Sequence, residues 1–315
     1  MVSIIIPNYN GKKYLERCVN SIYAYSTVPV ELIIIDNGSV DDNFEWLRRK
    51  YPQVILVRLD QNYGFSYAVN RGIKLATAPY VILLNNDTQI LPGFVENLLE
   101  LIKSNNKIFS AGAQMLKYDD PTLIDDAGDE YTALGWTVKR GEGQPRRSFN
   151  QTCSVFSSCA GAAIYRKDIF KEIGYFDRQF FAYMEDVDIC YRARNYGYTN
   201  LYCPRAKVLH IGSATSGSKY NTFKIRLAAR NNIYVPYKNM PLLQLIFNLP
   251  LLIIGILIKA VFFTCKGFGD DYVGGIFEGL ASLHKVTRMR YNKEHLRNYI
   301  KVQKLIIKNI AKILS

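Results

Sequence analysis

The chain has few of the residues that hold zinc clusters or disulfide frameworks. It contains three histidines and six cysteines in 315 residues, and no two cysteines form a Cys-x-x-Cys pair. This composition disfavours a zinc cluster and a disulfide scaffold, and scattered cysteines are typical of a cytosolic protein. The sequence also has no Walker P-loop and no Gly-x-Ser-x-Gly elbow, which disfavours a P-loop NTPase and an α/β-hydrolase.

Low-complexity segments and internal repeats are absent as well. Hydrophobic residues make up 49% of the chain and charged residues 21%, which excludes a disordered protein. We expect no signal peptide, because Met1 is followed at once by Val-Ser-Ile-Ile-Ile-Pro, without a basic n-region or a small-residue cleavage site. At about 100–200 residues per domain, the length predicts one large domain or two ordinary ones.

Positive charge is concentrated in the last third of the chain. The formal net charge is +13, and residues 219–315 carry 16 Lys and Arg against four Asp and Glu, whereas residues 1–218 carry 24 against 23. Such asymmetry indicates a polyanionic partner for the last third, either a membrane surface or a nucleic acid. We therefore predict a first domain over residues 1–218 and a basic, hydrophobic, helical region over residues 219–315.

Apolar runs of strand length alternate with helical patterns over the first hundred residues. This order predicts an α/β fold with a mostly parallel central sheet and helices on both faces. Residues 118–158 are predicted to form a long loop with short strands, and residues 159–210 to be ordered again. The predicted strands are 2–6, 31–35, 54–59 and 80–84, and the predicted helices are 12–25, 41–51, 67–76 and 92–104.

Polar clusters follow three of the predicted strands, at residues 7–10, 36–39 and 85–87. Because the carboxyl ends of parallel strands meet at one edge of a sheet, we expect these clusters to form a ligand site. Asp36 could accept a hydrogen bond from a pyrimidine imide or a ribose hydroxyl, or simply stabilise a turn. Asp87 could hold Mg²⁺ or Mn²⁺ against a diphosphate, or be an ordinary loop residue.

Three carboxylates lie within four residues at Glu185, Asp186 and Asp188. Carboxylates this close raise one another's pKa values, and Asp186 is the candidate general base. The alternative is a structural ion network with arginines of the same predicted helix, in which Asp188 pairs with Arg192. His210 follows an apolar strand and is either a structural residue or a metal ligand.

The basic third contains a run of 20 residues without formal charge, 239–258, which is about long enough to cross a bilayer. Polar residues and Pro250 interrupt the run, and basic residues flank both of its ends, so a re-entrant or in-plane helical pair is favoured over a single span. The alternative is a buried core helix pair. The C-terminal tail predicts a basic amphipathic helix at a membrane surface. Its apolar face is Val302, Leu305, Ile306, Ile310 and Ile313, and its basic stripe is Lys301, Lys304, Lys308 and Lys312.

Taken together, the motifs and their spacing are more specific than any one of them. They are Val-Ser-Ile-Ile-Ile-Pro-Asn-Tyr-Asn-Gly, Ile-Ile-Asp-Asn-Gly-Ser-x-Asp, Asn62-x-Gly64-Phe65, Asn70-x-Gly72, Leu-Leu-Asn-Asn-Asp-Thr, Gly-x-Phe-Asp-x-x-Phe-Phe-x-Tyr-x-Glu-Asp-Val-Asp and Val-x-His. Over about residues 1–235 the sequence resembles glycosyltransferase family 2, and within it the bacterial rhamnosyltransferase-like branch.

The resemblance implies a GT-A fold, a nucleotide-sugar donor and inverting chemistry. It assigns Asp186 as the base, with Glu185 and Asp188 in support, and Asp87 and His210 as ligands of Mg²⁺ or Mn²⁺. Asn85 departs from the family pattern, because it stands where the Asp-x-Asp metal motif has its first carboxylate. The donor pocket would be formed by Pro7, Tyr9, Asp36, Asn62, Asn70, Asn85 and Asn86.

From these observations we predict a transferase of cell-surface polysaccharide synthesis at the cytoplasmic face of the bacterial inner membrane. The expected donor is dTDP-rhamnose, and the expected acceptor is a lipid-linked glycan or a polysaccharide. One alternative is a UDP-sugar-dependent galactosyl- or N-acetylglucosaminyltransferase, and another is a non-catalytic membrane scaffold. A nucleic-acid partner is disfavoured, because the basic third lacks interleaved aromatic and arginine patches.

Overall fold

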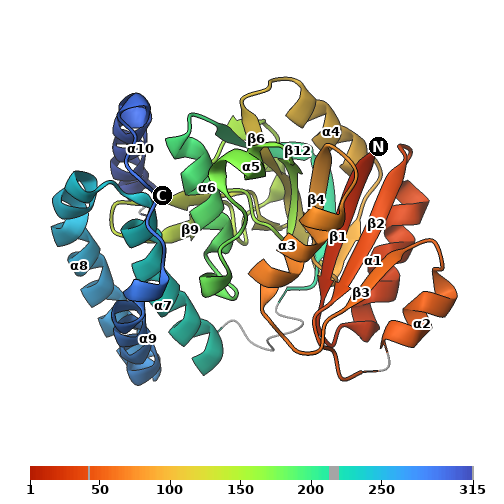
Figure 1. Cartoon of the computed structure of the whole chain (residues 1–315), viewed down its shortest axis with the longest axis horizontal. Helices are drawn as coiled ribbons and strands as arrows, with labels where there is room; N and C mark the ends of the chain where they lie inside the picture. The colour runs from red at the N-terminus through yellow and green to blue at the C-terminus, as the bar shows by residue number, and fades with distance from the viewer. Residues whose placement is uncertain (42, 213–219, 314–315) are drawn as a thin grey trace.

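The computed structural model describes residues 1–41, 43–212 and 220–313. Strands and helices alternate through the first hundred residues, and four long helices gather at the opposite side of the molecule (Figure 1). The strands are β1 (Val2–Asn8), β2 (Val30–Asp36), β3 (Ile55–Arg58), β4 (Tyr80–Leu84), β5 (Thr88–Ile90), β6 (Ile108–Lys117), β7 (Ile124–Asp126), β8 (Asp129–Tyr131), β9 (Thr137–Lys139), β10 (Cys153–Ser154), β11 (Ala162–Arg166) and β12 (Thr199–His210). The α-helices are α1 (Lys12–Tyr25), α2 (Asn43–Lys50), α3 (Phe65–Leu75), α4 (Phe94–Lys103), α5 (Ile169–Ile173), α6 (Glu185–Asn195), α7 (Thr222–Asn239), α8 (Leu242–Cys265), α9 (Gly269–Ala281) and α10 (Leu296–Lys308).

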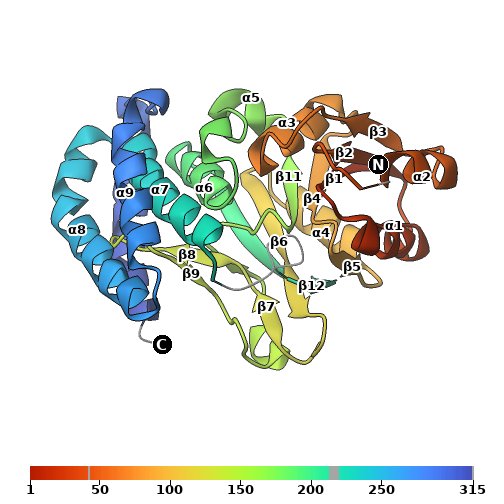
Figure 2. The same ribbon diagram turned by 90° about the horizontal axis from the view of Figure 1, so that it is seen from below.

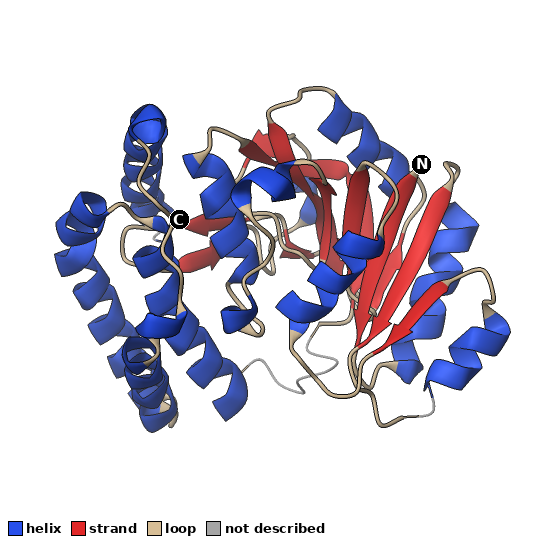
Figure 3. Cartoon of the chain, in the orientation of Figure 1, coloured by secondary structure: helices blue, strands red, loops and turns tan. Residues whose placement is uncertain are grey.

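The main sheet has the strand order β10-β12-β6-β11-β4-β1-β2-β3. Strands β1 to β4 are parallel where they pair, and β11 inserts antiparallel between β4 and β6. The strands β1, β2 and β4 are rich in Ile, Leu and Val because helices cover both of their faces. Figure 3 shows the helices on the two sides of the sheet. The predicted α/β fold with a mostly parallel core is therefore confirmed.

Two hydrophobic cores lie on the two faces of the sheet. Helices α1, α2 and α4 pack on one face, and α3, α5 and α6 on the other. The predicted strand over residues 80–84 matches β4, whereas the second strand extends one residue further than predicted, to Asp36. The segment predicted as a long loop with short strands, residues 118–158, contains the short strands β7 to β10. Of these, β8 and β9 form a hairpin that reaches toward α8 (Figure 2).

The amphipathic tail helix packs on the protein and not on a membrane. Val302 and Ile306 of α10 are 3% and 0% exposed, and they share a core with Tyr131, Phe156 and Tyr191. The prediction that this apolar face binds a membrane surface is therefore wrong. The spacing does correspond to a helix with one apolar face, but spacing cannot tell whether lipid or protein covers such a face.

The uncharged segment forms one helix, α8, and not a helical pair within residues 239–265. Pro250 lies inside α8, where it removes one backbone hydrogen bond without ending the helix. Among the helices that the structure describes, only α8 is long and apolar enough to cross a membrane by length and composition. Of its most apolar stretch of 18 residues, 17% is buried. The alternative of a buried core pair is therefore also wrong.

The predicted domain boundary at 218/219 lies outside the described residues, so this division remains a prediction.

Candidate active site

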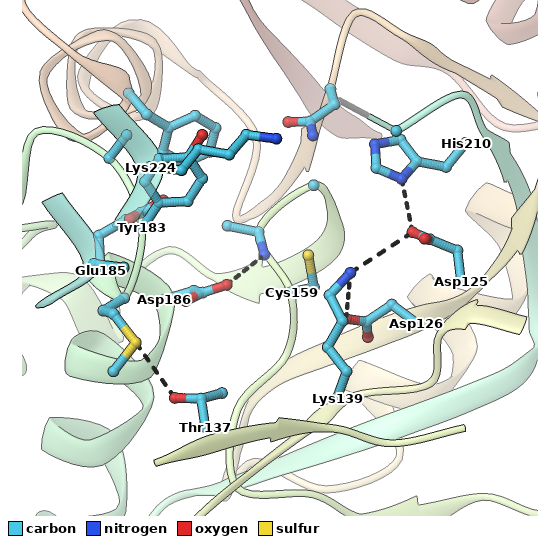
Figure 4. Close-up of a pocket in the computed structure, with 18 of the residues that line it drawn as sticks. Asp125, Asp126, Thr137, Lys139, Cys159, Tyr183, Glu185, Asp186, His210 and Lys224 are labelled. Atoms are coloured by element: carbon cyan, nitrogen blue, oxygen red, sulfur yellow. Dashed lines mark hydrogen bonds and ion pairs between the residues drawn. The ribbon is translucent and has the colours of Figure 1, made fainter. Parts of the chain in front are cut away.

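A cavity of about 1580 Å³ opens at the carboxyl ends of the central strands. Its walls come from the loops after β1, β2 and β4, from the end of β12, from the start of α6 and from the helices α7 to α9. Figure 4 shows that Asp186 and His210 lie on different walls of this cavity. Of the predicted site residues, those that line it are Pro7, Tyr9, Asn62, Asn85, Asn86, Asp87, Glu185, Asp186 and His210.

The polar clusters of the three strand ends meet, as the sequence predicts. The amide Nδ2 of Asn86 donates to Oδ1 of Asn8 at 2.7 Å, and Nδ2 of Asn8 in turn donates to Oδ1 of Asp36 at 3.3 Å. This chain of hydrogen bonds joins the ends of β4, β1 and β2. The second oxygen of Asp36, Oδ2, is buried without a hydrogen-bond donor among the described residues, and Arg58 lies 3.7 Å away. Asp36 itself is not part of the cavity wall, although its neighbour Asn37 is.

Asn62 shapes the loop before α3. Its Oδ1 accepts hydrogen bonds from Asn37 at 2.8 Å and from the backbone N–H of Gly64 at 2.9 Å. Gly64 has φ +86°, and a Cβ there would lie 2.6 Å from Phe181, so this close approach requires glycine. Asn70 lies elsewhere: its amide exchanges two hydrogen bonds with the backbone of Phe176, and it does not line the cavity.

Asp87, His210 and Asp125 form a hydrogen-bonded row at the cavity wall. His210 Nδ1 lies 2.8 Å from Asp125 Oδ2, and Nε2 lies 3.4 Å from Asp87 Oδ1. Burial works to lower the pKa of His210, but hydrogen bonds to Asp125 and Asp87 outweigh it and raise the pKa to about 9. Asp125 also fixes the orientation of the imidazole ring, as carboxylates do for metal-binding histidines.

Asp87 would hold a divalent cation that is shared with a diphosphate, and His210 would join it as a ligand once its Nε2 has lost its proton. Mg²⁺ is usually bound through one or two carboxylates together with substrate phosphates. No group of three or more His, Cys, Asp or Glu is placed to hold a metal among the residues that the structure describes. Because Asn85 replaces a carboxylate, this pair would need the diphosphate oxygens to complete the coordination.

Asp186 is held at the start of α6 by backbone N–H groups. Val187 donates to its Oδ1 at 2.8 Å and Ala160 to its Oδ2 at 3.4 Å. Burial is the main cause that raises the pKa of Asp186 to about 6, against these hydrogen bonds. A carboxylate with a pKa near the working pH is suited to general base catalysis.

The backbone before Asp186 is strained. Phe181, Tyr183 and Met184 have φ values of 62°, 66° and 69°, a left-handed conformation that costs free energy for residues with side chains. Such strain is found most often at functional sites, where the surrounding structure enforces it. Here it directs Tyr183, Glu185 and Asp186 into the cavity (Figure 4).

The other two acidic residues of α6 have different surroundings. Glu185 lines the cavity, and burial together with Asp186 raises its pKa well above the usual range. Asp188 is fully buried outside the cavity wall and pairs with Arg192 at 2.7 Å and with Lys238 at 3.1 Å. Burial would raise the pKa of Asp188, but these cations lower it. The structure thus contains the pairing with Arg192 that the sequence offered as the alternative to a supporting catalytic role.

Sequence reasoning missed a second set of charged groups on the cavity floor. They come from β7, β8 and β9 within residues 118–158, and Figure 4 shows two of the acids beside the Lys139 ammonium. Lys139 Nζ lies 4.0 Å from a carboxylate oxygen of each, and the two carboxylates raise its pKa against the effect of burial. The available signal was the density of acids, which are four of the eight residues 124–131. The residues of this set are Asp125, Asp126, Asp129 and Lys139.

Comparisons with known proteins agree with this architecture. The family model described as glycosyl transferase family 2 matches residues 3–174. An N-acetylglucosaminyl-diphospho-decaprenol L-rhamnosyltransferase of Mycobacterium tuberculosis is 28% identical over 249 residues, which are 69% of this chain and 78% of the relative. A poly-beta-1,6-N-acetyl-D-glucosamine synthase of Staphylococcus epidermidis is 26% identical over 208 residues, 65% of this chain and 48% of the relative. This chain therefore spans about half the length of the synthase.

Among solved structures, a mannosyltransferase of Pyrobaculum calidifontis in complex with GDP-Man and Mn²⁺ has a similar fold. The TM-score is 0.54 at 14% identity, over 99% of this chain and 86% of that chain. At this identity the likeness concerns the fold alone, and it agrees with the GT-A fold that the sequence predicts.

Proposed function

The chain belongs to glycosyl transferase family 2, and on that premise we propose that it is an inverting, metal-dependent hexosyltransferase with a nucleotide-sugar donor. The observation that carries the proposal is the pair of facing walls in one cavity, with Asp186 on one and Asp87 with His210 on the other. One wall supplies a base for an acceptor hydroxyl, and the other supplies ligands for a diphosphate-bound cation. Asp188 is not needed for either task.

The reaction is a single in-line displacement. Asp186 takes the proton of the acceptor hydroxyl while the hydroxyl oxygen bonds to the anomeric carbon and the bond to the diphosphate breaks. No enzyme nucleophile takes part, so the anomeric configuration inverts. A divalent cation held by Asp87 and His210 would stabilise the negative charge of the leaving diphosphate as a Lewis acid. Asn85, Asn86, Pro7 and Tyr9 line the same part of the cavity and would surround the donor.

The Oδ2 of Asp36, which accepts no hydrogen bond from the described residues and lies 3.7 Å from Arg58, favours a pyrimidine nucleotide. A buried acceptor without a donor is costly, and the imide N–H of thymine or uracil would satisfy it. We propose dTDP-rhamnose as the donor, in keeping with the rhamnosyltransferase relative. The alternative is UDP-N-acetylglucosamine or another UDP-sugar, which the same carboxylate would accept and which the relationship to the poly-N-acetylglucosamine synthase favours.

The exposed apolar side chains of α8 support attachment to a membrane, here the cytoplasmic face of the bacterial inner membrane. Leu243, Phe247 and Val261 are 82%, 66% and 65% exposed. Large exposed apolar surfaces of this kind mark sites that bind a membrane or another protein. With α8 lying in the bilayer interface, the cavity would be next to lipid, and a lipid-linked glycan is the acceptor we propose. Residues 1–218 would carry the reaction and residues 219–315 the attachment.

The test is release of nucleoside diphosphate from a panel of dTDP-, UDP- and GDP-sugars, with Mg²⁺ or Mn²⁺ and a bacterial lipid extract as acceptor source. We expect release from one donor, lost with a chelator and in Asp186→Asn. Retention of activity in Asp186→Asn would contradict the assignment of the base. Absence of both release and donor binding would contradict the proposed function and favour a non-catalytic scaffold.

A further inference from the structure

The cavity extends beyond the space that one donor needs. Its volume of about 1580 Å³ exceeds the roughly 300–1,000 Å³ of ordinary small-molecule sites. Beyond the start of α6, the walls consist of side chains from α7, α8 and α9, among them Ile225, Phe263 and Tyr272. The cavity therefore joins the polar strand ends to the helices whose outer surface is apolar.

Two polar groups at this helical end have no hydrogen-bond or ion-pair partner among the described residues. The ammonium of Lys259, on α8, makes no ion pair or hydrogen bond with any described residue, and its neighbour is the ring of Trp136, 5.5 Å away. Tyr272, on α9, is 2% exposed, and its hydroxyl lacks a hydrogen-bond partner among the described residues. A buried hydroxyl without a hydrogen bond is costly unless a ligand satisfies it, and a half-buried ammonium whose neighbour is an aromatic ring can still bind an anion.

Phe263 connects the two groups within the cavity wall. Tyr272 stacks on Phe263, with 5.1 Å between the ring centroids. Phe263 is four residues after Lys259, so Lys259 and Phe263 lie on the same face of α8. Trp136 Nε1 donates to the carbonyl oxygen of Gly255 at 3.0 Å, which fixes α8 to the β8–β9 hairpin. A Cβ on Gly255 would lie 2.1 Å from the carbonyl oxygen of Leu134, so the backbones of α8 and the hairpin approach each other closely at this glycine.

The opposite face of α8 is apolar and exposed. Leu257, Ile258 and Val261, which flank Lys259 in sequence, are 59%, 48% and 65% exposed. Figures 1 and 2 place α8 at the outer edge of the molecule in both views. A single ligand that pairs with Lys259 and Tyr272 inside the cavity and covers the apolar outer face must have an anionic group and a long apolar chain.

We infer that Lys259 and Tyr272 bind the diphosphate of a polyprenyl-diphosphate-linked acceptor, whose chain leaves the cavity along α8. This assignment rests on the proposed function and adds the residues that select the acceptor. Lys224, on α7, also points into this cavity (Figure 4) and adds positive charge to it. The donor diphosphate lies at the other end, beside Asp87 and His210.

The test measures binding to phosphatidylcholine vesicles that contain a polyprenyl diphosphate, with vesicles of equal charge made with phosphatidylglycerol as reference. We expect wild-type protein to bind the first kind at least about tenfold more tightly, as charge-assisted hydrogen bonds allow. Lys259→Met and Tyr272→Phe should lose most of this preference. Lys266→Met changes an exposed lysine at the end of the same helix and should keep it.

Measuring dTDP and UDP binding by each variant distinguishes failure of this inference from failure of the proposed function. Unchanged nucleotide affinity with a lost vesicle preference supports the inference and shows that the variants fold. The inference is overturned if wild-type protein shows no preference, if Lys259→Met keeps it, or if that variant loses nucleotide affinity by the same factor. Failure of the proposed function would instead appear as absent nucleotide binding in wild-type protein, whatever the vesicle result.

Discussion

The side-chain amide of Asn231, on α7, donates to the carbonyl oxygen of Tyr183 at 2.7 Å. The same Nδ2 lies 2.9 Å from the carbonyl oxygens of Phe180 and Ala182. One buried amide thus holds the strained turn that leads into Asp186. The C-terminal region therefore contributes to the position of the base without touching it.

Substitution Asn231→Ala should lower kcat by about tenfold or more, because small displacements of a catalytic group are costly. The donor KM should change little, since the donor residues lie on other walls. Asn195→Ala is the matched control: its amide also satisfies a buried carbonyl oxygen, that of Asn239, but at the far end of α6. Equal losses of kcat in the two variants would show that Asn231 contributes stability alone.

Activity should increase with pH through about 6. Only the ionised form of Asp186 accepts a proton, and burial raises its pKa to about 6, so kcat/KM should fall as pH drops below that value. Asp126→Asn should move the midpoint to lower pH, because the charge of Asp126 helps to raise the pKa of Asp186. A profile that is flat around pH 6 in wild-type protein would contradict the assignment.

Asp125→Asn should weaken activation by Mn²⁺ by about 10- to 100-fold, as loss of a residue that orients a metal-binding histidine does. Asp125 lies 2.8 Å from His210 Nδ1, and the amide cannot hold the ring in the same way. The measurement is activity against Mn²⁺ concentration. Asp120→Asn changes an exposed acid of the same segment and should leave the curve unchanged.

Leu243→Gln combined with Phe247→Gln should reduce binding to phosphatidylglycerol vesicles several-fold, because two exposed apolar side chains of α8 no longer enter the lipid. The control is Ile55→Gln with Leu75→Gln, which changes exposed apolar residues of β3 and α3. Point substitutions suit this test better than removal of residues 239–315, which would also remove the buried residues of α10. Equal vesicle binding by both double variants would refute attachment through α8.

Ile306→Ala should lower the free energy of unfolding by about 2–5 kcal/mol, because it leaves a cavity in the core. Ile306 is fully buried, whereas its neighbour Ile307 is 44% exposed. Ile307→Ala should therefore change stability by less than about 0.5 kcal/mol. Urea denaturation measures both, and similar small effects would mean that α10 is not part of the folded core.

Much of the fold could be read from local patterns. The β-branched runs identify the strands because their side chains are buried on both faces, and the polar residues after Pro7, Ile35 and Leu84 meet since parallel strands end at one edge. The acids around Asp186 were predicted to share a helix with Arg192, and α6 confirms that helix. These features depend on residues that are close in sequence.

Tertiary structure decided which groups face one another. Asp125 and Lys139 reach the cavity because β7 pairs with β6 and the β8–β9 hairpin packs against α6. Asn231 meets Tyr183 across 48 residues. The sequence analysis assigned both the uncharged run 239–258 and the amphipathic tail to a membrane, yet α10 is covered by protein and α8 is exposed. The sequence by itself determined where strands, helices and polar clusters form, because backbone preference and periodicity are local. What covers each apolar face, and which charges become partners, depends on long-range packing that no local pattern contains.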